Sequence, residues 1–198
     1  IKEADGVKRD AAGRPIASAE LLVIADLPKA STGTAANAQV RGVQPEAFEL
    51  RPEVRIIEGR NFTPGPRELI VGRGAASQFA DMEVGAKIAF RDSDWTIVGI
   101  FEAGGGSHES ELWGDVDVVQ SAYRRNNAFQ SVNLQLESPA ALNTVRASLA
   151  GDPRLTLKVQ SQKEYYEAQS KQLSTVINVI GTVIAAIMAI GAVFGALN

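Results

Sequence analysis

The sequence predicts an α+β domain followed by one long helix, and three observations lead to this class. All 20 basic and 23 acidic residues lie in residues 1–171, so a charged globular region precedes an apolar tail. Short apolar or alternating stretches, separated by Gly, Pro and Asp, run through the globular region and are typical of short strands mixed with short helices. A helix-capping sequence then opens a helical pattern that continues toward the C-terminus.

The expected elements follow one another along the globular region. We expect strands at residues 18–27, 39–43, 54–57, 68–71, 86–91, 95–102, 130–137 and 155–159. We expect short helices at 45–50, 73–79, 116–125 and 139–149, the last with Ser138 as its N-cap. Residues 30–38 are small and polar and are expected to form a loop, and Asp92-Ser93-Asp94 a hairpin turn.

Composition excludes some classes of function. The net charge of −3 argues against a nucleic-acid-binding surface, which needs clustered Lys and Arg. The chain has no cysteine, so it forms no disulfide and no thiolate metal site.

The C-terminal stretch, residues 173–197, reads LSTVINVIGTVIAAIMAIGAVFGAL and carries no charge. A membrane-spanning helix needs roughly 20 mainly apolar residues, so we predict a transmembrane helix over 173–198, with a buried core helix as the alternative. Gly191 and Gly195 form a G-x-x-x-G pair, and with Gly181 they allow close packing of two helices in lipid. Glycine is also simply frequent in membrane helices.

A polar helical segment, residues 161–172, leads into this stretch. Ser161 and Glu164 fit the capping box S-x-x-E, and Glu167 can pair with Lys163 and Lys171 at i,i+4 spacing. No Gly or Pro interrupts residues 162–180. We therefore predict one continuous helix from 162 to about 197, roughly 54 Å long, as a rigid stalk.

The residues that could carry chemistry form no credible catalytic set. Gly72-Arg73-Gly74 lacks the third glycine of a dinucleotide fingerprint, and Gly104–Ser107 lacks the Gly-Lys of a phosphate loop; we expect a tight turn and a hinge or mobile tip. His108 lies among acidic residues whose spacing fits no EF-hand. We expect no catalytic residue, cofactor or metal.

Glu109, Glu111 and Trp113 form the last candidate site. Trp113 lies in what reads as a charged loop, and tryptophan is a frequent anchor in protein interfaces. We expect either a partner contact through these three residues or a tryptophan that folds back onto the core.

Several short motifs occur in an order that resembles a known family. Val40–Val43, followed by Ile57–Phe62, resembles the "G-V … G-R-x-F" signature of the MacB-like periplasmic core domain. Glu68–Gly72, Val84-Gly85 and Trp95–Ile100 continue it, and the apolar helix resembles the start of an FtsX-like membrane core. The resemblance covers nearly the whole chain. The glycine-rich stretch and the residues around Trp113 fall outside the general pattern and leave the substrate open.

The resemblance implies a permease of an ABC transporter of the MacB, LolC and FtsX type in the bacterial inner membrane, with this domain on the periplasmic side. It implies a two-lobed extracytoplasmic domain: a porter-like βα lobe from residues 1–59 and 116–160, an inserted β-rich lobe at 60–115, a stalk at 161–172 and a transmembrane helix at 173–198. The implied partners are a cytoplasmic ATP-binding subunit, a second permease copy or paralogue, a periplasmic adaptor protein and the lipid bilayer. The alternative is a membrane-anchored binding or adhesion domain without a transport role.

Overall fold

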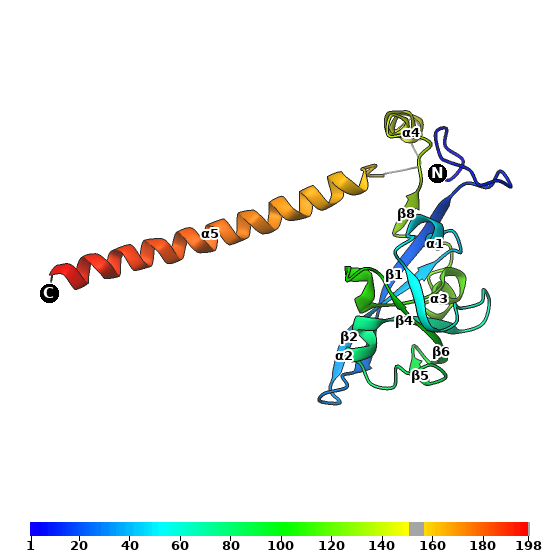
Figure 1. The fold of residues 1–198 in the computed structure, drawn as a ribbon, viewed down its shortest axis with the longest axis horizontal. Helices are drawn as coiled ribbons and strands as arrows, with labels where there is room; N and C mark the ends of the chain where they lie inside the picture. The colour runs from blue at the N-terminus through cyan, green and yellow to red at the C-terminus, as the bar shows by residue number, and fades with distance from the viewer. Residues whose placement is uncertain (151–156, 198) are drawn as a thin grey trace. The chain divides into compact units, whose positions relative to one another are not determined.

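The computed structural model describes residues 1–150 and 157–197. The chain divides into two compact units, Ile1–Ser148 and Leu149–Asn198. The first unit carries the β-sheet, and the long helix α5 (Gln162–Leu197) belongs to the second (Figure 1).

An eight-stranded mixed sheet is the framework of the first unit, with strand order β3-β6-β4-β7-β2-β1-β8 and β5 paired to β6. Its strands are β1 (Ala17–Pro28), β2 (Ala35–Val43), β3 (Arg55–Gly59), β4 (Glu68–Gly72), β5 (Lys87–Phe90), β6 (Ser93–Glu102), β7 (Glu111–Asp115) and β8 (Ser131–Leu134). The short helices are α1 (Ala47–Leu50), α2 (Arg73–Gln78), the 3₁₀ turn η1 (Ser107–Ser110), α3 (Val116–Ala122) and α4 (Ala141–Ala150). The observed class is therefore α+β, as predicted.

The two faces of the sheet bury two different apolar clusters, because successive side chains of a strand point to opposite faces. Leu112 and Val40 belong to the larger cluster, together with Val116 and Val119 of α3. Trp113 and Val43 belong to the smaller cluster, which includes Ala47 of α1 together with Phe62, Ile70, Val98, Phe101 and Ala103. Helices α3 and α2 therefore contribute to the larger cluster, and α1 contributes to the smaller one.

Several local predictions were wrong. Strand β2 begins at Ala35, so residues 35–38 of the expected loop at 30–38 are strand, because the long partner β1 continues to Pro28 and supplies hydrogen bonds to these small residues. The β5–β6 turn lies at Arg91 and Asp92, which both have positive φ, whereas Ser93 and Asp94 already pair in the ladder. Two left-handed residues are the geometry of a tight hairpin turn. Of the strand expected at 155–159, residues 155 and 156 lie outside the described residues, and residues 157–159 are not in a strand.

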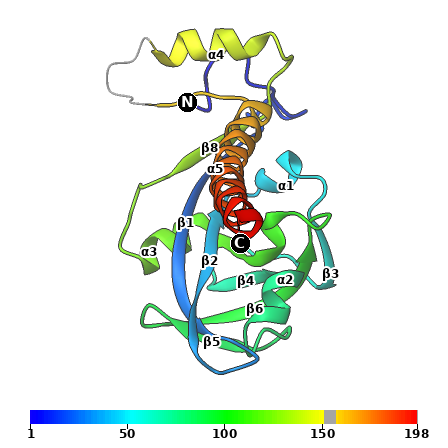
Figure 2. The same ribbon diagram turned by 90° about the vertical axis from the view of Figure 1, so that its left-hand side faces the viewer.

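Strand pairing joins the two predicted lobes. Strands β3 and β2, from residues 1–59, pair with β6 and β7 of the predicted insert at 60–115, so both lobes contribute strands to one sheet. The division of the domain into 1–59 with 116–160 and 60–115 stays a prediction. The strand partner changes at a different place, within β1. Its residues 17–20 pair with β8 and its residues 21–28 with β2 (Figure 2).

The continuous helix predicted from residue 162 is present as α5. Among the residues that the structure describes, no helix meets the length and hydropathy needed to cross a bilayer. The membrane span predicted at 173–198 is therefore not confirmed.

Candidate functional site

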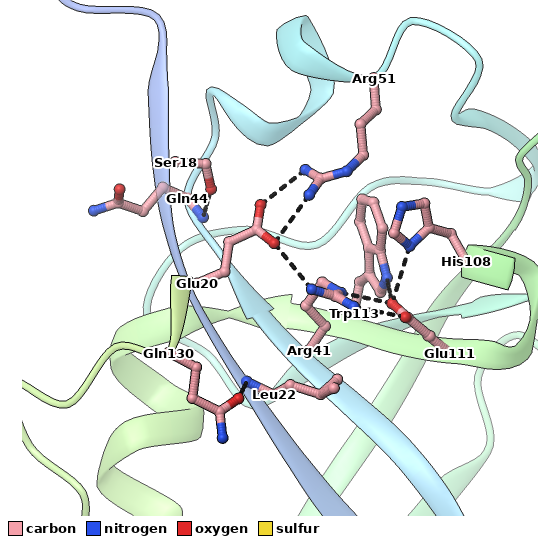
Figure 3. A network of polar contacts seen from close by, with 10 residues as sticks. All are labelled: Ser18, Glu20, Leu22, Arg41, Gln44, Arg51, His108, Glu111, Trp113 and Gln130. Carbon is pink, nitrogen blue, oxygen red and sulfur yellow. Dashed lines mark hydrogen bonds and ion pairs between the residues drawn. The ribbon is translucent and has the colours of Figure 1, made fainter. Parts of the chain in front are cut away.

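A buried network of charged side chains lies on the face of the sheet that carries Trp113 (Figure 3). Four charged residues from four segments meet there: Glu20 of β1, Arg41 of β2, Arg51 at the C-terminal cap of α1, and Glu111 of β7. The parallel β2–β7 register sets Arg41 opposite Trp113, two residues from Glu111 on the same face. Two carboxylates and two guanidinium groups make the network neutral overall.

The pair between Arg41 and Glu111 has the geometry of a two-pronged fork. Nε of Arg41 donates to Oε2 of Glu111 at 2.6 Å, and Nη2 donates to Oε1 at 2.7 Å. The planar guanidinium matches the carboxylate in this arrangement, which joins β2 to β7 through side chains as well as through the strand ladder.

Glu20 joins the two arginines. Its side chain is 1% exposed, and Oε2 accepts hydrogen bonds from Nη1 of Arg41 at 3.1 Å and from Nη2 of Arg51 at 3.0 Å. Nη1 of Arg51 lies 2.8 Å from Oε1 of Glu20 as an ion pair without the geometry of a hydrogen bond. A carboxylate buried this deeply is stable as an ion only because both cations face it.

Trp113 and His108 close the network on its aromatic side. Nε1 of Trp113 donates to Oε2 of Glu111 at 2.8 Å, and Nδ1 of His108 lies 3.4 Å from the same oxygen. The Arg51 guanidinium stands over the indole at 5.4 Å, within the range of a cation–π contact. The His108 ring meets the indole edge-on at 5.4 Å.

The network changes the acidity of its members. Burial would raise the pKa of Glu111, but the hydrogen bonds from Arg41, His108 and Trp113 and the Arg41 charge outweigh burial and lower this pKa to about 2. Burial would lower the pKa of Arg41, but the hydrogen bonds and charges of Glu111 and Glu20 raise it further above its ordinary value. Glu111 and Arg41 are therefore both charged at neutral pH.

Glu109, Glu111 and Trp113, the predicted partner contact, all lie inside the domain. Trp113 is fully buried, and Glu109 and Glu111 are buried as well. The sequence reading placed Trp113 in a loop, whereas it lies in β7, where its neighbours on the same face are core residues. A partner could reach these side chains only after the domain opened, so the second expectation, a tryptophan on the core, agrees with the structure.

The glycine-rich stretch before η1 is a turn closed by the chain's own carboxylate. Oε1 of Glu109 accepts the backbone N–H groups of Ala103 and Gly105, both at 2.8 Å, and these bonds lower the pKa of Glu109. Gly104 and Gly105 have φ of 60° and 76°, which side chains rarely adopt. The predicted hinge or mobile tip is therefore a tied turn.

Gly72 allows this turn to pack against the start of α2. A Cβ atom on Gly72 would lie 2.3 Å from the carbonyl oxygen of Glu109, which no side chain can do without moving backbone. The tight strand–helix turn expected at Gly72-Arg73-Gly74 is present between β4 and α2. Its glycines serve packing between two backbones.

The start of α5 forms the predicted capping box. Oγ of Ser161 accepts the backbone N–H of Glu164 at 3.1 Å, and Oε2 of Glu164 accepts the backbone N–H of Ser161 at 2.7 Å. Lys163 lies 3.9 Å from Glu167 as an exposed i,i+4 pair. The side chain of Lys171 lies outside the described residues.

The predicted helix-packing glycines are only partly described. Gly181 has open space around it, and the surroundings of Gly191 and Gly195 lie outside the described residues. Within the same stretch, Oγ1 of Thr182 donates to the backbone carbonyl of Asn178 at 2.8 Å. This bond satisfies the hydroxyl inside its own helix, as a polar side chain in an apolar helix requires.

Sequence reasoning missed Glu20, Arg41 and Arg51. A signal existed for Glu20, because it is an acid next to the apolar run of β1, and such a residue must find a cation when the strand is buried. Its partners come from α1 and β2, and their proximity follows only from the tertiary fold. In residues 1–150 and 157–197, no group of three acidic or histidine side chains has the arrangement to hold a metal ion.

The comparisons with known proteins agree with this fold. The model of the family described as the MacB-like periplasmic core domain matches residues 3–151, and the chain belongs to this family. A comparison with curated protein sequences gave no match.

Three solved structures share the fold at low sequence identity. The extracellular domain of YknZ, a noncanonic ABC-type transporter from Gram-positive bacteria, is 16% identical with a TM-score of 0.57, over 75% of this chain and 78% of that one. The periplasmic region of MacB from Actinobacillus actinomycetemcomitans is 9% identical with a TM-score of 0.51, over 88% and 70%. A domain of a putative permease from Porphyromonas gingivalis is 15% identical with a TM-score of 0.51, over 75% and 70%.

Proposed function

We propose that this chain is the extracytoplasmic domain and adjoining helix of an ABC transporter permease, and that it passes motion between the membrane and the outer domain. Family membership supports the placement, since the YknZ and MacB domains of the same fold come from transporters of this kind. The observation that carries the mechanical role is helix α5, which is capped at Ser161 and continuous from Gln162 to Leu197.

A continuous helix can transmit displacement because its backbone hydrogen bonds resist bending over many turns. Residues 172–198 carry no charge, and the run at 173–197 is long enough for a bilayer. We propose that this apolar part crosses the membrane and that residues 161–172 extend outside it as the stalk. Two permease copies, drawn together by ATP binding in a cytoplasmic subunit, would then move their outer domains through these helices.

The experiment uses the complete permease with its ATP-binding subunit in proteoliposomes. The chain has no cysteine of its own, and with any other cysteines of the complex replaced, Gln78→Cys on the exposed side of α2 gives one label site per copy. A spin label is attached at this site, and the distance between the two labels of a dimer is measured by double electron–electron resonance spectroscopy, without nucleotide and with ATP plus vanadate. The proposal expects a distance change that disappears when Gly-Ser-Gly-Ser is inserted after Gln172, while the ATPase rate is kept.

The matched control inserts a helix-forming segment of two full turns at the same point, which keeps the rod continuous and should keep the distance change. A change that survives the Gly-Ser insertion would show that α5 is not the transmitting element. No change in the parent protein would reject the mechanical role and favour a tethered binding domain.

A further inference from the structure

The place where β1 changes partners divides the first unit into two parts. We define the terminal lobe as residues 1–20 and 131–148, and the sheet lobe as residues 21–130. The terminal lobe is held together by β1–β8 pairing and by the bridge between Val7 and Leu136. Its buried apolar residues, Val7, Ile16, Ala17, Ala19 and Val145, belong to neither of the two core clusters.

Several polar contacts join the two lobes. Gln44, just past the end of β2, accepts the N–H of Ala19 through Oε1 at 2.8 Å, and its own N–H donates to Oγ of Ser18 at 3.3 Å. Nζ of Lys2 also donates to the Gln44 side chain. On the other edge of β1, the backbone N–H of Gln130 in the sheet lobe donates to the carbonyl oxygen of Glu20 in the terminal lobe at 2.9 Å, and Oε1 of Gln130 accepts the N–H of Leu22 within the sheet lobe at 2.9 Å.

These glutamine side chains stand in for the missing strand partners. Pairing of β1 with β2 covers only residues 21–28, so the N–H of Ala19 has no partner in β2. Pairing of β1 with β8 covers only residues 17–20, so the N–H of Leu22 has no partner in β8. An amide side chain satisfies it without the continuous ladder that stiffens a sheet. A polar contact surface between two small cores is the usual setting for relative motion.

Glu20 lies at this junction and ties it to the sheet lobe. It is the last β1 residue paired with β8, and its carboxylate is held by Arg41 of β2 and Arg51 at the end of α1 (Figure 3). We propose that the Glu20–Leu21 junction is a hinge between the terminal lobe and the sheet lobe, and that the Glu20–Arg41–Arg51 contacts are the clamp that holds it in the observed position. The hinge itself rests on these contacts alone. In the chain, α4 of the terminal lobe directly precedes the segment leading to α5, so the hinge could take part in transmission; this second step rests on the proposed function.

The test measures the distance between the lobes in the full chain, reconstituted in lipid nanodiscs. Spin labels are placed at Asn143→Cys in the terminal lobe and Asp117→Cys in the sheet lobe, both exposed positions. Labelled chains are diluted with unlabelled chains so that distances within one chain are read. Glu20→Gln removes the charge of the clamp and should shift or broaden the distance distribution.

Glu68→Gln is the matched control, because Glu68 forms a similar paired contact with Arg60 within the sheet lobe, away from the junction. It should leave the distribution as in the parent. Gln44→Ala is the second opening variant and stays informative if Glu20→Gln fails to fold. A disulfide between Ser18→Cys and Gln44→Cys, formed in the Glu20→Gln variant, should restore the narrow distribution. In this experiment the labels at 117 and 143 are attached afterwards by a chemistry that does not use cysteine.

The hinge is overturned if Glu20→Gln or Gln44→Ala folds and gives the parent distribution, or if Glu68→Gln moves it equally. The proposed function fails separately. If the lobes move but the disulfide leaves the nucleotide-driven distance change of the complete permease intact, the hinge stands and its part in transmission is rejected.

Discussion

Replacing Glu111 by glutamine should remove a measurable, pH-dependent part of the domain's stability. The pKa of Glu111 falls from its ordinary value of 4.5 to about 2 in the folded domain, although burial opposes this change, because Arg41, His108 and Trp113 bind the ionised form. At about 1.4 kcal/mol per pKa unit, this difference corresponds to about 3 kcal/mol of folding free energy. Because the folded pKa is the lower one, the contribution is complete above about pH 4.5 and is lost as the pH falls toward 2.

The assay is urea unfolding of the full chain, followed by tryptophan fluorescence at several pH values from 7 to 2.5. Both tryptophans, Trp95 and Trp113, are fully buried in the first unit, so fluorescence reports on that unit. At pH 7 the Glu111→Gln variant should be less stable than the parent by about 3 kcal/mol or more, since it leaves Arg41 buried with one carboxylate fewer. The difference should shrink steadily below pH 4.5.

The control is Glu83→Gln, an exposed residue after α2, which should follow the parent at every pH within about 0.5 kcal/mol. A gap between Glu111→Gln and the parent that stays constant from pH 7 to 3 would refute the reasoning. It would mean that the lost stability comes from packing of the side chain and not from its charge.

Two further outcomes are expected from contacts in the structure. Gly72→Ala should lower the free energy of unfolding by about 3 kcal/mol, the upper end for overpacking, since its Cβ would lie 2.3 Å from the carbonyl oxygen of Glu109. Gly74→Ala, whose Cβ would lie 2.9 Å from the same oxygen, should lower it less, and equal losses in urea unfolding would contradict this ranking. Ser161→Ala should weaken the first turn of α5 by about 1 kcal/mol, seen as roughly fivefold faster amide exchange at Glu164, while Ser170→Ala on the same helix should leave that exchange rate unchanged.

The sequence-based predictions were strongest where one physical signal acts locally. The capping box and the unbroken helical pattern placed α5 correctly because both depend on residues within four positions of each other. The strand at β1 followed from a long apolar run. The loop expected at 30–38 was wrong because those small residues have no strand preference of their own and are ordered by pairing with β1.

The ion-pair network could not be predicted because its members are far apart in the chain. Arg41 and Glu111 are separated by 70 residues, and only the parallel pairing of β2 with β7 places them on one face. The placement of Trp113 in a loop was wrong for the same reason. Its charged neighbours suggest a solvated loop. Both acids can nevertheless be buried, because the charge of Glu111 is paired with Arg41 and that of Glu109 is stabilised by hydrogen bonds from backbone amides.

The network suits the movement that the proposed function assigns to this domain. A hinge closed by apolar contacts would release free energy gradually as the surfaces part, since the hydrophobic effect scales with area. A buried carboxylate held by two arginines behaves differently, because Glu20 loses most of its compensation once the first ion pair lengthens. The proposed clamp would therefore hold the observed position sharply, and a force at the terminal lobe would act on a defined set of contacts, those of Glu20 with Arg41 and Arg51.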